Sequence, residues 1–366
     1  MKTQAAVLNA VRTPFEVTEV ELDPPGPGEA LIKMAAAGVC HSDWHVVDGL
    51  LEKTLPMILG HEGSGTVVEV GEGVTLVAPG DPVILSWVPE CGVCPFCVSG
   101  HSNLCDGRQP YSDGTLGDDI IRFHRNGQRI RHFNGVSSFA AYSVVPEHGA
   151  VKIPREMPLD KAALIGCATS TGVGAVLFTA KVPAGATMAV FGCGGVGLNA
   201  IQGGAIANAS RIIAVDVEPR KLQMARDLGA TEGVNAAEGD PVEQIMELTG
   251  GLGVEYAFEA IGRGKTMAQA FLSLTKRGTA CCIGIAAGDD RIEIPPRNLV
   301  YAERRLIGSF YGSTRPRVDF ARFVEMYLRG ILKLDELVTR TYPLTGINEA
   351  YAAMNAGEVA RSLIVY

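Results

Sequence analysis

The amino-acid sequence predicts a two-domain α/β protein in which one domain is a doubly wound, mostly parallel sheet. Three observations support this prediction. At 366 residues the chain is longer than a single hydrophobic core usually serves. Residues 2–150 read as short strands separated by Gly and Pro turns, whereas strands and helices alternate from about residue 183 onward. Between residues 187 and 216 a strand, a glycine-rich turn, a helix and a second strand lead to a carboxylate.

The glycine-rich turn of residues 192–197 predicts a dinucleotide-binding site. Gly192 allows a tight turn, Gly194 lets a pyrophosphate approach the backbone, and Gly197 lets the next helix pack closely on the sheet. The N–H groups at that helix's N-terminus favour phosphates. Asp216 follows Gly197 by nineteen residues, close to the spacing at which an acid receives ribose hydroxyls. We expect NAD rather than NADP, because the carboxylate would repel a 2′-phosphate.

The other elements follow from residue periodicity. In the first half we expect strands at residues 5–8, 15–21, 29–36, 65–70, 81–86 and 140–145. In the second half we expect strands at 187–191, 211–215, 256–259, 280–284 and 306–310, and helices at 198–208, 218–228, 242–248 and 266–274. The tail adds helices at 320–328 and 347–355 and a closing strand at 363–365, and we expect it to return to the first domain.

Composition and charge narrow the classes of function. The formal net charge of -8 argues against nucleic acid as a partner, which would need a basic face. The sequence shows no apolar run of the roughly 18 residues that span a bilayer, and the N-terminus lacks the apolar core of a secretory signal. We therefore expect a cytoplasmic protein without a membrane partner. In that reducing compartment, metal ligation is the first role to consider for the nine cysteines.

Four cysteines lie close together in the sequence. Cys91, Cys94, Cys97 and Cys105 form a C-x2-C-x2-C-x7-C pattern in a segment that contains Gly and Pro. Four thiolates can surround Zn²⁺ as a closed tetrahedron, which is typical of structural zinc. Four free thiols are the plain alternative, although exposed thiols oxidise readily. An iron–sulfur cluster is the other alternative, because the spacing alone does not exclude it.

Three further candidate ligands are far apart in the sequence. Cys40, His61 and Cys167 would supply two thiolates and one imidazole, leaving a fourth position open as in catalytic zinc sites. Each residue alone is weak evidence, because a single cysteine is more often a small core residue. We interpret Cys193, Cys281 and Cys282 as structural, because they fall in expected strands or in the glycine-rich turn.

Several segments together resemble the zinc-dependent medium-chain alcohol dehydrogenases over essentially the whole chain. They are Cys40-His41-Ser42-Asp43, Gly60-His61-Glu62-Gly63-Ser64-Gly65, the four-cysteine segment, the glycine-rich turn and Phe258-Glu259-Ala260-Ile261-Gly262. Residues 113–139 resemble the longer loop of the animal-type and glutathione-dependent branches. The resemblance implies a chaperonin-10-like catalytic domain at 1–168, a Rossmann domain at 169–311, a return to the catalytic domain at 312–366, and an active site between the domains.

The resemblance also implies roles for individual residues. Cys40, His61 and Cys167 would hold catalytic zinc, with Glu62 beside the metal and Asp43 orienting His61. The four-cysteine segment would hold a second zinc. Ser42 and His45 would form a proton relay, although outside this context a turn residue and a surface histidine are the commoner interpretations. The implied cofactor contacts are His41, Gly192, Gly194, Gly195, Val196, Gly197, Asp216, Lys221 and Arg361, and the implied pocket residues are Leu51, Trp87, Phe133 and Asn134.

The expected activity is hydride transfer between a primary alcohol, aromatic or allylic among the options, and NAD, giving the aldehyde. His41 stands where many relatives have arginine, which should weaken cofactor binding because imidazole lacks a bidentate guanidinium. One alternative is a dehydrogenase of thiol adducts of formaldehyde, and another is a non-catalytic protein that binds NAD and zinc.

We expect a homodimer, with a tetramer as the alternative, because the last strand of the parallel sheet would leave an apolar edge.

Overall fold

Two units make up the structure, a computed structural model that describes all residues 1–366. Unit 1 comprises Met1–Cys167, Arg315–Gly330 and Leu334–Tyr366, and unit 2 comprises Ala168–Thr314 and Ile331–Lys333. The sequence placed the two boundaries after residues 168 and 311, and the structure has them after 167 and 314. The short segment 331–333, which belongs to unit 2, interrupts the return of the chain to unit 1.

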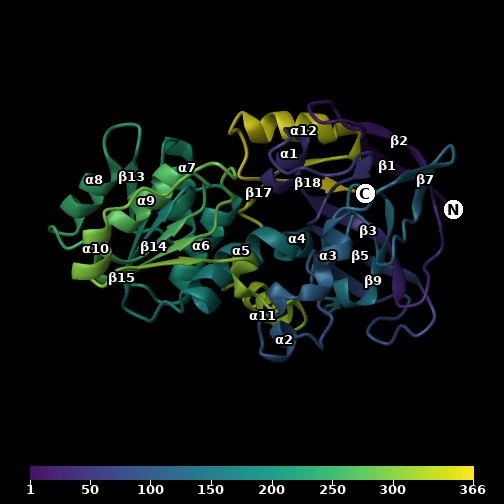
Figure 1. Cartoon of the computed structure of the whole chain (residues 1–366), viewed down its shortest axis with the longest axis horizontal. Coiled ribbons are helices and arrows are strands. Elements are labelled where there is room, and N and C mark those ends of the chain that lie inside the picture. The colour runs from purple at the N-terminus through teal and green to yellow at the C-terminus, as the bar shows by residue number, and fades with distance from the viewer. The chain divides into compact units, whose positions relative to one another are not determined.

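Unit 2 contains the predicted doubly wound sheet, and all of its strand pairs are parallel. The spatial order is β13-β12-β11-β14-β15-β16. These strands are β11 (Thr187–Phe191), β12 (Arg211–Asp216), β13 (Glu232–Asn235), β14 (Val254–Glu259), β15 (Leu274–Cys282) and β16 (Arg305–Gly308). The helices are α6 (Gly195–Ile206), α7 (Pro219–Asp227), α8 (Pro241–Leu248), α9 (Gly264–Leu272) and α10 (Pro296–Tyr301), and Figure 1 shows them among the strands.

The central strands β11, β12 and β14 of this sheet are largely buried, whereas the edge strand β16 is partly exposed. Phe191 of β11, Val215 of β12 and Ala257 of β14 lie in one cluster of buried apolar side chains. Such strands read as nearly continuous apolar runs rather than alternating ones. The strand order reverses between β11 and β14. In open α/β sheets, ligands bind at such a reversal, beyond the carboxyl ends of the strands.

Unit 1 is built on two mostly antiparallel sheets. The five-stranded sheet has the order β4-β1-β2-β7-β8, and the seven-stranded sheet has the order β10-β6-β5-β3-β18-β17 with β9 paired to β3. Only the pair β17–β18 is parallel. The strands are β1 (Lys2–Leu8), β2 (Glu16–Leu22), β3 (Glu29–Gly38), β4 (Met57–Ile58), β5 (Gly63–Val70), β6 (Pro82–Leu85), β7 (Phe123–Arg125), β8 (Gln128–Ile130), β9 (Tyr142–Pro146), β10 (Ala150–Lys152), β17 (Val338–Tyr342) and β18 (Arg361–Val365).

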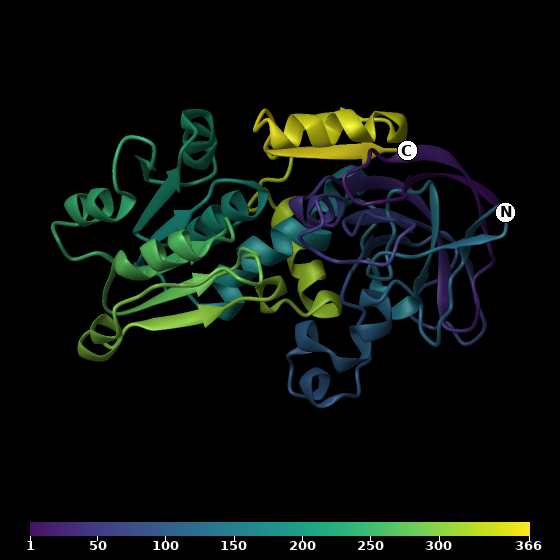
Figure 2. The same cartoon turned by 45° about the horizontal axis from the view of Figure 1, so that its top comes forward.

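The tail and several short helices complete unit 1. Strand β18 pairs antiparallel with β3, and Figure 2 shows α12 lying along β18. In the same view the segment around residues 91–112, in blue, forms a lobe of its own. The helices are α1 (His41–Val47), α2 (Pro95–Val98), α3 (Gln109–Ser112), α11 (Pro316–Leu328) and α12 (Ile347–Asn355). Single 3₁₀ turns lie at Ser102–Leu104, Asp106–Arg108, Glu147–Gly149 and Leu344–Gly346, and one more lies in unit 2 at Tyr311–Ser313.

One long helix departs from the sequence expectation. It comprises α4 (Leu159–Leu164), the π-helical turn η4 (Ile165–Thr169), α5 (Ser170–Gly174) and a second π-helical turn, η5 (Ala175–Thr179). An 18-residue window of this 21-residue helix has a mean hydropathy of 1.6, so by length and composition the helix could cross a bilayer, and the expectation of no such apolar run is wrong. However, 78% of the apolar window is buried inside the protein, as in a core helix. Burial on all sides removes the amphipathic periodicity by which helices are predicted.

The remaining differences concern short elements. The sequence analysis missed β4, β7, β8, β10, β13 and β17, as well as α1, α2, α3 and α10. Most of these elements have two to six residues, too few to establish a period of 2.0 or 3.6. Their existence depends on a neighbouring strand or on side-chain contacts, not on local propensity.

Two glycines of the turn after β11 make different demands on the fold. A Cβ added to Gly197 would collide with the carbonyl oxygen of Gly192, whereas a Cβ added to Gly194 would meet nothing within 4 Å. We therefore predict that Gly197→Ala destabilises unit 2 by about 1–3 kcal/mol, the usual cost of overpacking, and that Gly194→Ala is tolerated. Chemical denaturation of both variants checks this prediction. Equal stability of the two variants would contradict it.

Candidate functional site

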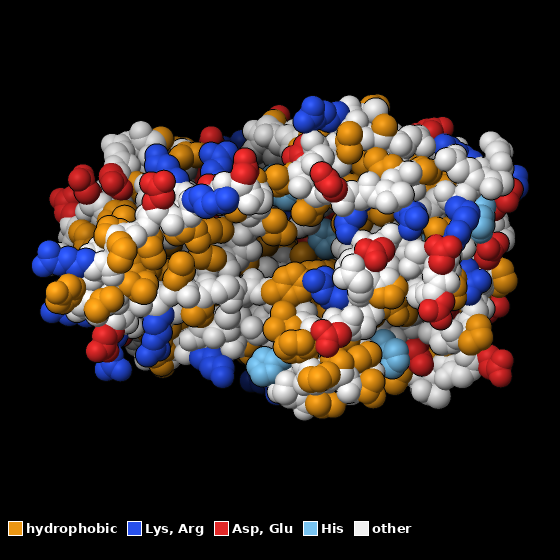
Figure 3. Space-filling model, in the orientation of Figure 1, with side chains coloured by type: hydrophobic (Ala, Val, Ile, Leu, Met, Phe, Trp, Pro, Cys, Tyr) orange, Lys and Arg blue, Asp and Glu red, His pale blue; other side chains and the backbone are white.

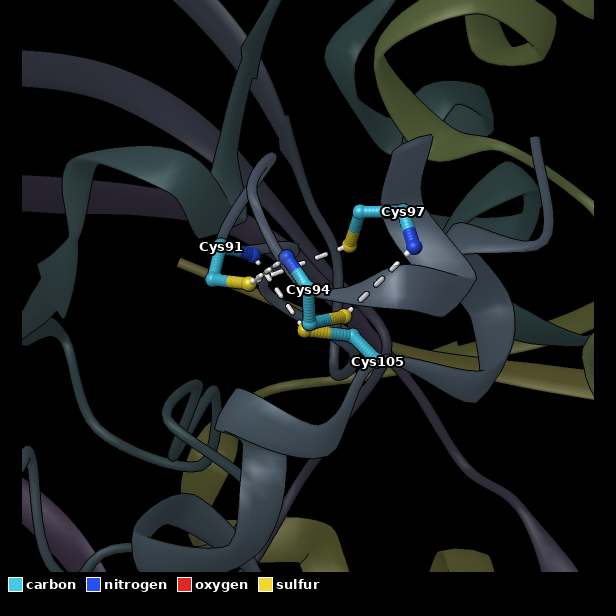
Figure 4. Close-up of side chains that lie close together, drawn as sticks. All are labelled: Cys91, Cys94, Cys97 and Cys105. Atoms are coloured by element: carbon cyan, nitrogen blue, oxygen red, sulfur yellow. Dashed lines mark hydrogen bonds between the residues drawn. The ribbon is translucent and has the colours of Figure 1, made fainter. Parts of the chain in front are cut away.

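The four clustered cysteines converge in the lobe of unit 1. Their four Sγ atoms lie within 4.8 Å of one another, and Figure 4 shows the sulfurs pointing toward a common centre. Cys94 caps the N-terminus of α2, where its Sγ accepts a hydrogen bond from the backbone N–H of Cys97. The N–H of Cys94 in turn donates to Cys91 Sγ at 3.3 Å. Backbone donors at Cys97 and Asp106 lower the pKa of the Cys94 thiol to about 6 and so favour its thiolate.

These contacts describe a site that could hold a metal ion. All nine cysteines of the chain are free, so none of the four is taken by a disulfide. Four thiolates with backbone N–H donors to sulfur match the donor set of a closed zinc site, because zinc accepts four sulfur ligands in a tetrahedron. The four side chains leave no place for a substrate, which is the property of a structural rather than a catalytic metal.

A second cluster of possible metal ligands lies in the core of unit 1. Ligand atoms of Cys40, His61, Glu62 and Cys167 lie within 4.8 Å of one another, and all four residues are buried. Cys40 lies immediately before α1, and His61 and Glu62 lie immediately before β5. Cys167 lies in the π-helical turn η4, a rare conformation that recurs at functional sites. The fold thus brings together three residues that the sequence could only suggest separately.

Asp43 fixes the orientation of the His61 ring. Nδ1 of His61 lies 3.1 Å from Asp43 Oδ1, and that oxygen also accepts the backbone N–H of Gly60 at 2.9 Å. Nε2, on the other side of the ring, lies 3.3 Å from Cys167 Sγ. Because a carboxylate accepts the proton on Nδ1, Nε2 is left with its lone pair for a metal. Burial opposes a charged ring, but Asp43 and Cys40 together raise the pKa of His61 well above its ordinary value.

Glu62 and Arg361 form a buried ion pair at the edge of this cluster. An Nη atom of Arg361 donates to Glu62 Oε2, and the two side chains are 5% and 0% exposed. A Cβ on Gly38 would collide with the Glu62 carboxylate, so glycine at this position leaves room for the pair. Burial raises the pKa of Glu62 to about 7, while Arg361 opposes the rise. Arg361, which the sequence assigned to the cofactor, therefore lies beside the candidate metal ligands.

The first turns of α1 carry the residues of the expected relay. The Oγ atom of Ser42 lies 3.8 Å from Cys40 Sγ, so the hydroxyl is close to the second cluster. Nδ1 of His45 lies 3.7 Å from a carboxylate oxygen of Asp48, and both side chains are partly exposed. His41 is exposed at the start of α1. His41, Ser42 and His45 thus lie on one helix, which begins directly after the buried Cys40.

Aromatic side chains flank His61 within unit 1. The ring of Phe133 is 5.8 Å from that of His61 and the ring of Trp87 is 6.2 Å away, both in edge-to-face geometry. Phe133 is fully buried, whereas Trp87 is half-buried. Leu51 and Asn134, the other two expected pocket residues, are also half-buried. The surroundings of His61 are therefore aromatic on the side of Trp87 and Phe133.

The expected dinucleotide site lies in unit 2. The Oδ2 atom of Asp216 accepts the backbone N–H of Cys193 at 2.7 Å, and Oδ1 accepts the N–H of Glu218 at 3.0 Å. These bonds tie the carboxylate at the end of β12 to the glycine-rich turn. No side chain caps the N-terminus of α6, where Gly194, Gly195 and Val196 are partly exposed. Lys221 lies in the first turns of α7. Free N–H groups at a helix N-terminus beside an anchored carboxylate fit a pyrophosphate and a ribose.

Two features of the site were absent from the sequence analysis. The ion pair of Glu62 and Arg361 joins residues 299 positions apart, and no local pattern could reveal it. Asp48, by contrast, follows His45 by three residues on one helix. That i, i+3 spacing places side chains on the same face, so the pair could have been found from the sequence.

Two family models match the chain, the alcohol dehydrogenase GroES-like domain over residues 26–155 and the zinc-binding dehydrogenase over residues 195–329. The NDMA-dependent alcohol dehydrogenase of Amycolatopsis methanolica is 38% identical over 369 residues, covering 100% of this chain and 99% of the relative. An alcohol dehydrogenase zinc-binding domain protein from Burkholderia ambifaria has a TM-score of 0.96 at 34% identity. Benzyl alcohol dehydrogenase from Acinetobacter calcoaceticus has a TM-score of 0.92 at 30% identity. Both of these structures cover 100% of this chain, which covers 99% of each.

Similarity over the full length, both in sequence and in fold, agrees with the two cysteine-containing clusters and with the anchored carboxylate of the parallel sheet. The chain belongs to the zinc-dependent medium-chain alcohol dehydrogenase family.

Proposed function

We propose that this alcohol dehydrogenase oxidises a primary aromatic alcohol to the aldehyde, with zinc held by Cys40, His61 and Cys167. The observation that carries the proposal is the second cluster, in which Asp43 orients His61 so that Nε2 faces the two thiols. Two thiolates and one imidazole leave a fourth position for substrate, in contrast to the four-cysteine site. We assign a second zinc to Cys91, Cys94, Cys97 and Cys105.

The chemistry divides between the bound groups and the protein. Zinc at this site would supply a Lewis acid that lowers the pKa of an alcohol, and NAD would supply the hydride acceptor. The side chain of Ser42, next to the cluster, would take the hydroxyl proton, and the partly exposed His45 would pass it toward solvent.

The proposed electron acceptor is inferred from the carboxylate at the end of β12. Asp216, fixed by two backbone N–H groups, supports NAD over NADP because it would repel a 2′-phosphate. The Amycolatopsis relative is named for its dependence on NDMA. We therefore propose NAD as the bound dinucleotide, and we treat NDMA as an acceptor to be compared with free NAD.

The substrate class rests on the aromatic side chains near His61. Aromatic pairs prefer edge-to-face or offset packing, so Trp87 and Phe133 would favour a benzyl-type ring over a short aliphatic chain. The benzyl alcohol dehydrogenase of Acinetobacter calcoaceticus supports this choice by similarity. Asn134, the polar member of the expected pocket residues, would admit a polar substituent on the ring.

We also propose a homodimer formed through unit 2. Strand β16 is the edge of the parallel sheet, and α10 leaves Val300 and Tyr301 exposed at 70% and 79%. Figure 3 shows hydrophobic side chains gathered on the face that carries α9, α10 and β15. Pairing two such edges about a twofold axis would cover both. Light scattering that gives the 38.6 kDa of a single chain would refute this proposal, and a tetramer would extend it.

The activity prediction compares substrates and acceptors in one panel. Initial rates with benzyl, allylic and short aliphatic alcohols should be highest for the benzyl alcohol, with NAD preferred over NADP. Asp216→Gly should narrow the difference between NAD and NADP, because it removes the charge that repels the 2′-phosphate. Turnover that appears only with NDMA would reject NAD as a free cosubstrate. If the enzyme turned over only a thiol adduct of formaldehyde, the proposed aromatic alcohol would be wrong and the thiol adduct would be the substrate.

The metal prediction separates the two clusters. Purified protein should contain two equivalents of zinc. Cys97→Ser should lower the melting temperature, because structural zinc contributes directly to folding, whereas Cys167→Ser should abolish activity with little change in melting temperature. Cys282→Ser, a half-buried cysteine outside both clusters, is the matched control and should retain both metals. One equivalent or less in the wild type would count against the assignment.

The relay prediction ranks two substitutions. Ser42→Ala should lower the oxidation rate by about 10²-fold or more, the lower range of general-base assistance. His45→Gln should cost less than about tenfold and be rescued by added imidazole, because the ring is partly exposed and water can replace it. Rates with unlabelled and deuterated alcohol show whether hydride transfer limits each variant. A Ser42→Ala enzyme with the wild-type hydride-transfer rate would remove Ser42 from the mechanism.

A further inference from the structure

Several buried polar atoms around the second cluster lack a hydrogen-bond partner within the protein. They are Asp43 Oδ2, Glu62 Oε1, Arg361 Nε, Ser362 Oγ and Tyr351 Oη. Buried polar groups are nearly always paired with protein or with ordered water, so each of these atoms requires an explanation. Glu62 and Arg361 already belong to the ion pair described above. The hydroxyl of Tyr351 has no place in the mechanism, and Asp43 uses only Oδ1 for His61 and Gly60.

The ring of Tyr351 is held firmly in the core of unit 1. Tyr351 lies on α12 and is 1% exposed. Its ring stacks on Trp44 with a centroid distance of 5.6 Å and on Phe15 at 5.4 Å, and Phe139 packs edge-on at 6.2 Å. Because the hydroxyl oxygen lies in the plane of the ring, these three contacts also fix its position.

The same contacts place α1 against the Tyr351 ring. Trp44, which stacks on Tyr351, is the residue after Asp43. Asp43, Val46 and Val47 are the buried residues of α1, and their spacing puts them on one face of the helix. Val46 and Val47 belong to the same apolar cluster as Tyr351. The carboxylate of Asp43 therefore enters the core on the side of α1 that α12 covers.

The electrostatic environment makes Tyr351 a permanent donor. Burial, together with the negative charges of Asp43, Cys40 and Glu62, raises the pKa of the Tyr351 hydroxyl well above its ordinary value. A phenol that stays protonated offers one O–H, and Asp43 Oδ2 is a buried acceptor without another partner.

We propose that Tyr351 is a positioning residue of the metal site, whose hydroxyl donates through a bound water molecule to Asp43 Oδ2. The two atoms are not in direct hydrogen-bond contact, and one ordered water can join buried polar groups at little cost. With Oδ1 committed to His61 and Gly60, a partner on Oδ2 would hold the carboxylate against rotation. The inference rests on the proposed function in one respect, namely that zinc occupies Cys40, His61 and Cys167.

Tyr351→Phe tests the inference, because it keeps the stacked ring and removes only the hydroxyl. Zinc release to a chromogenic chelator would be followed in holoenzyme, with the release phase of this site identified by its loss in Cys167→Ser. Outer partners of metal ligands are typically worth 10–100-fold in metal affinity or activity, so release from this site should accelerate about tenfold. Release from the four-cysteine site serves as the internal reference and should not change.

Tyr327→Phe is the matched control, because it also removes a tyrosine hydroxyl bonded to a carboxylate, Asp335 at 2.8 Å, outside both clusters. It should leave both release phases unchanged. If Tyr351→Phe released zinc at the wild-type rate, the inference would be overturned. Acceleration of both release phases together would also overturn it, because that result would indicate a general loss of stability. Wild-type protein that releases zinc from the four-cysteine site alone would instead overturn the proposed function.

A double-mutant cycle adds a second criterion. If Tyr351 acts through the Asp43 carboxylate, Asp43→Asn should accelerate release on its own, and adding Tyr351→Phe should change it little further. If the rate increases of the two single variants multiply in the double variant, the two residues act independently, and the inference is overturned. Melting temperatures of all variants confirm that each comparison is made between folded proteins.

Discussion

The candidate catalytic site depends on the buried hydrogen bond between Asp43 and His61. One oxygen of Asp43 holds both the imidazole Nδ1 and the backbone N–H of Gly60, so a single atom joins α1 to the segment that enters β5. Cys40 lies directly before α1, so the same bond holds the helix that follows this thiol next to the imidazole. A carboxylate that is 0% exposed needs these partners, because a buried charge without them is strongly unfavourable. The constraint orients the ring and keeps Nε2 directed at Cys167.

The two clusters differ in how far apart their residues lie in the sequence. The four cysteines lie within residues 91–105, and backbone N–H groups of the same lobe bond to their sulfurs. Such a site can form as soon as the lobe closes around a metal. Cys40, His61 and Cys167 meet only when β3, β5 and the long helix of residues 159–179 are in place. The first cluster is therefore suited to stability, and the second to chemistry that requires a completed fold.

Glycine positions show how closely the backbone approaches the functional groups. Gly38 leaves space for the ion pair of Glu62 and Arg361, and Gly60, at φ 87°, would clash with Ser138 and Phe139 if it carried a Cβ. Gly197 is required by the packing of α6 on the turn after β11. Gly194, by contrast, is not required by any contact within the protein. The same residue type is thus required by packing at some positions and not at others.

The sequence by itself determined the class of the fold, the closed cysteine cluster and the dinucleotide turn. All three depend on local patterns, namely alternating strands and helices, cysteine spacing, and glycines between a strand and a helix. It also named Cys40, His61 and Cys167, but only the resemblance to a family joined them, because no spacing rule relates positions so far apart. Short strands and the mostly buried helix of residues 159–179 escaped prediction, since neither carries a usable period.

The tertiary structure decided which of the named residues meet and what each one contacts. It placed Arg361 on Glu62, and it put the Tyr351 ring against Trp44. These contacts join elements as distant as β18 and the segment before β5, so they depend on the pairing of β18 with β3 and on the burial of α12. Local sequence sets propensities and spacings, whereas the neighbours of a buried charge or ring are set by long-range packing. That is the physical reason why residue types could be chosen from the sequence but their partners could not.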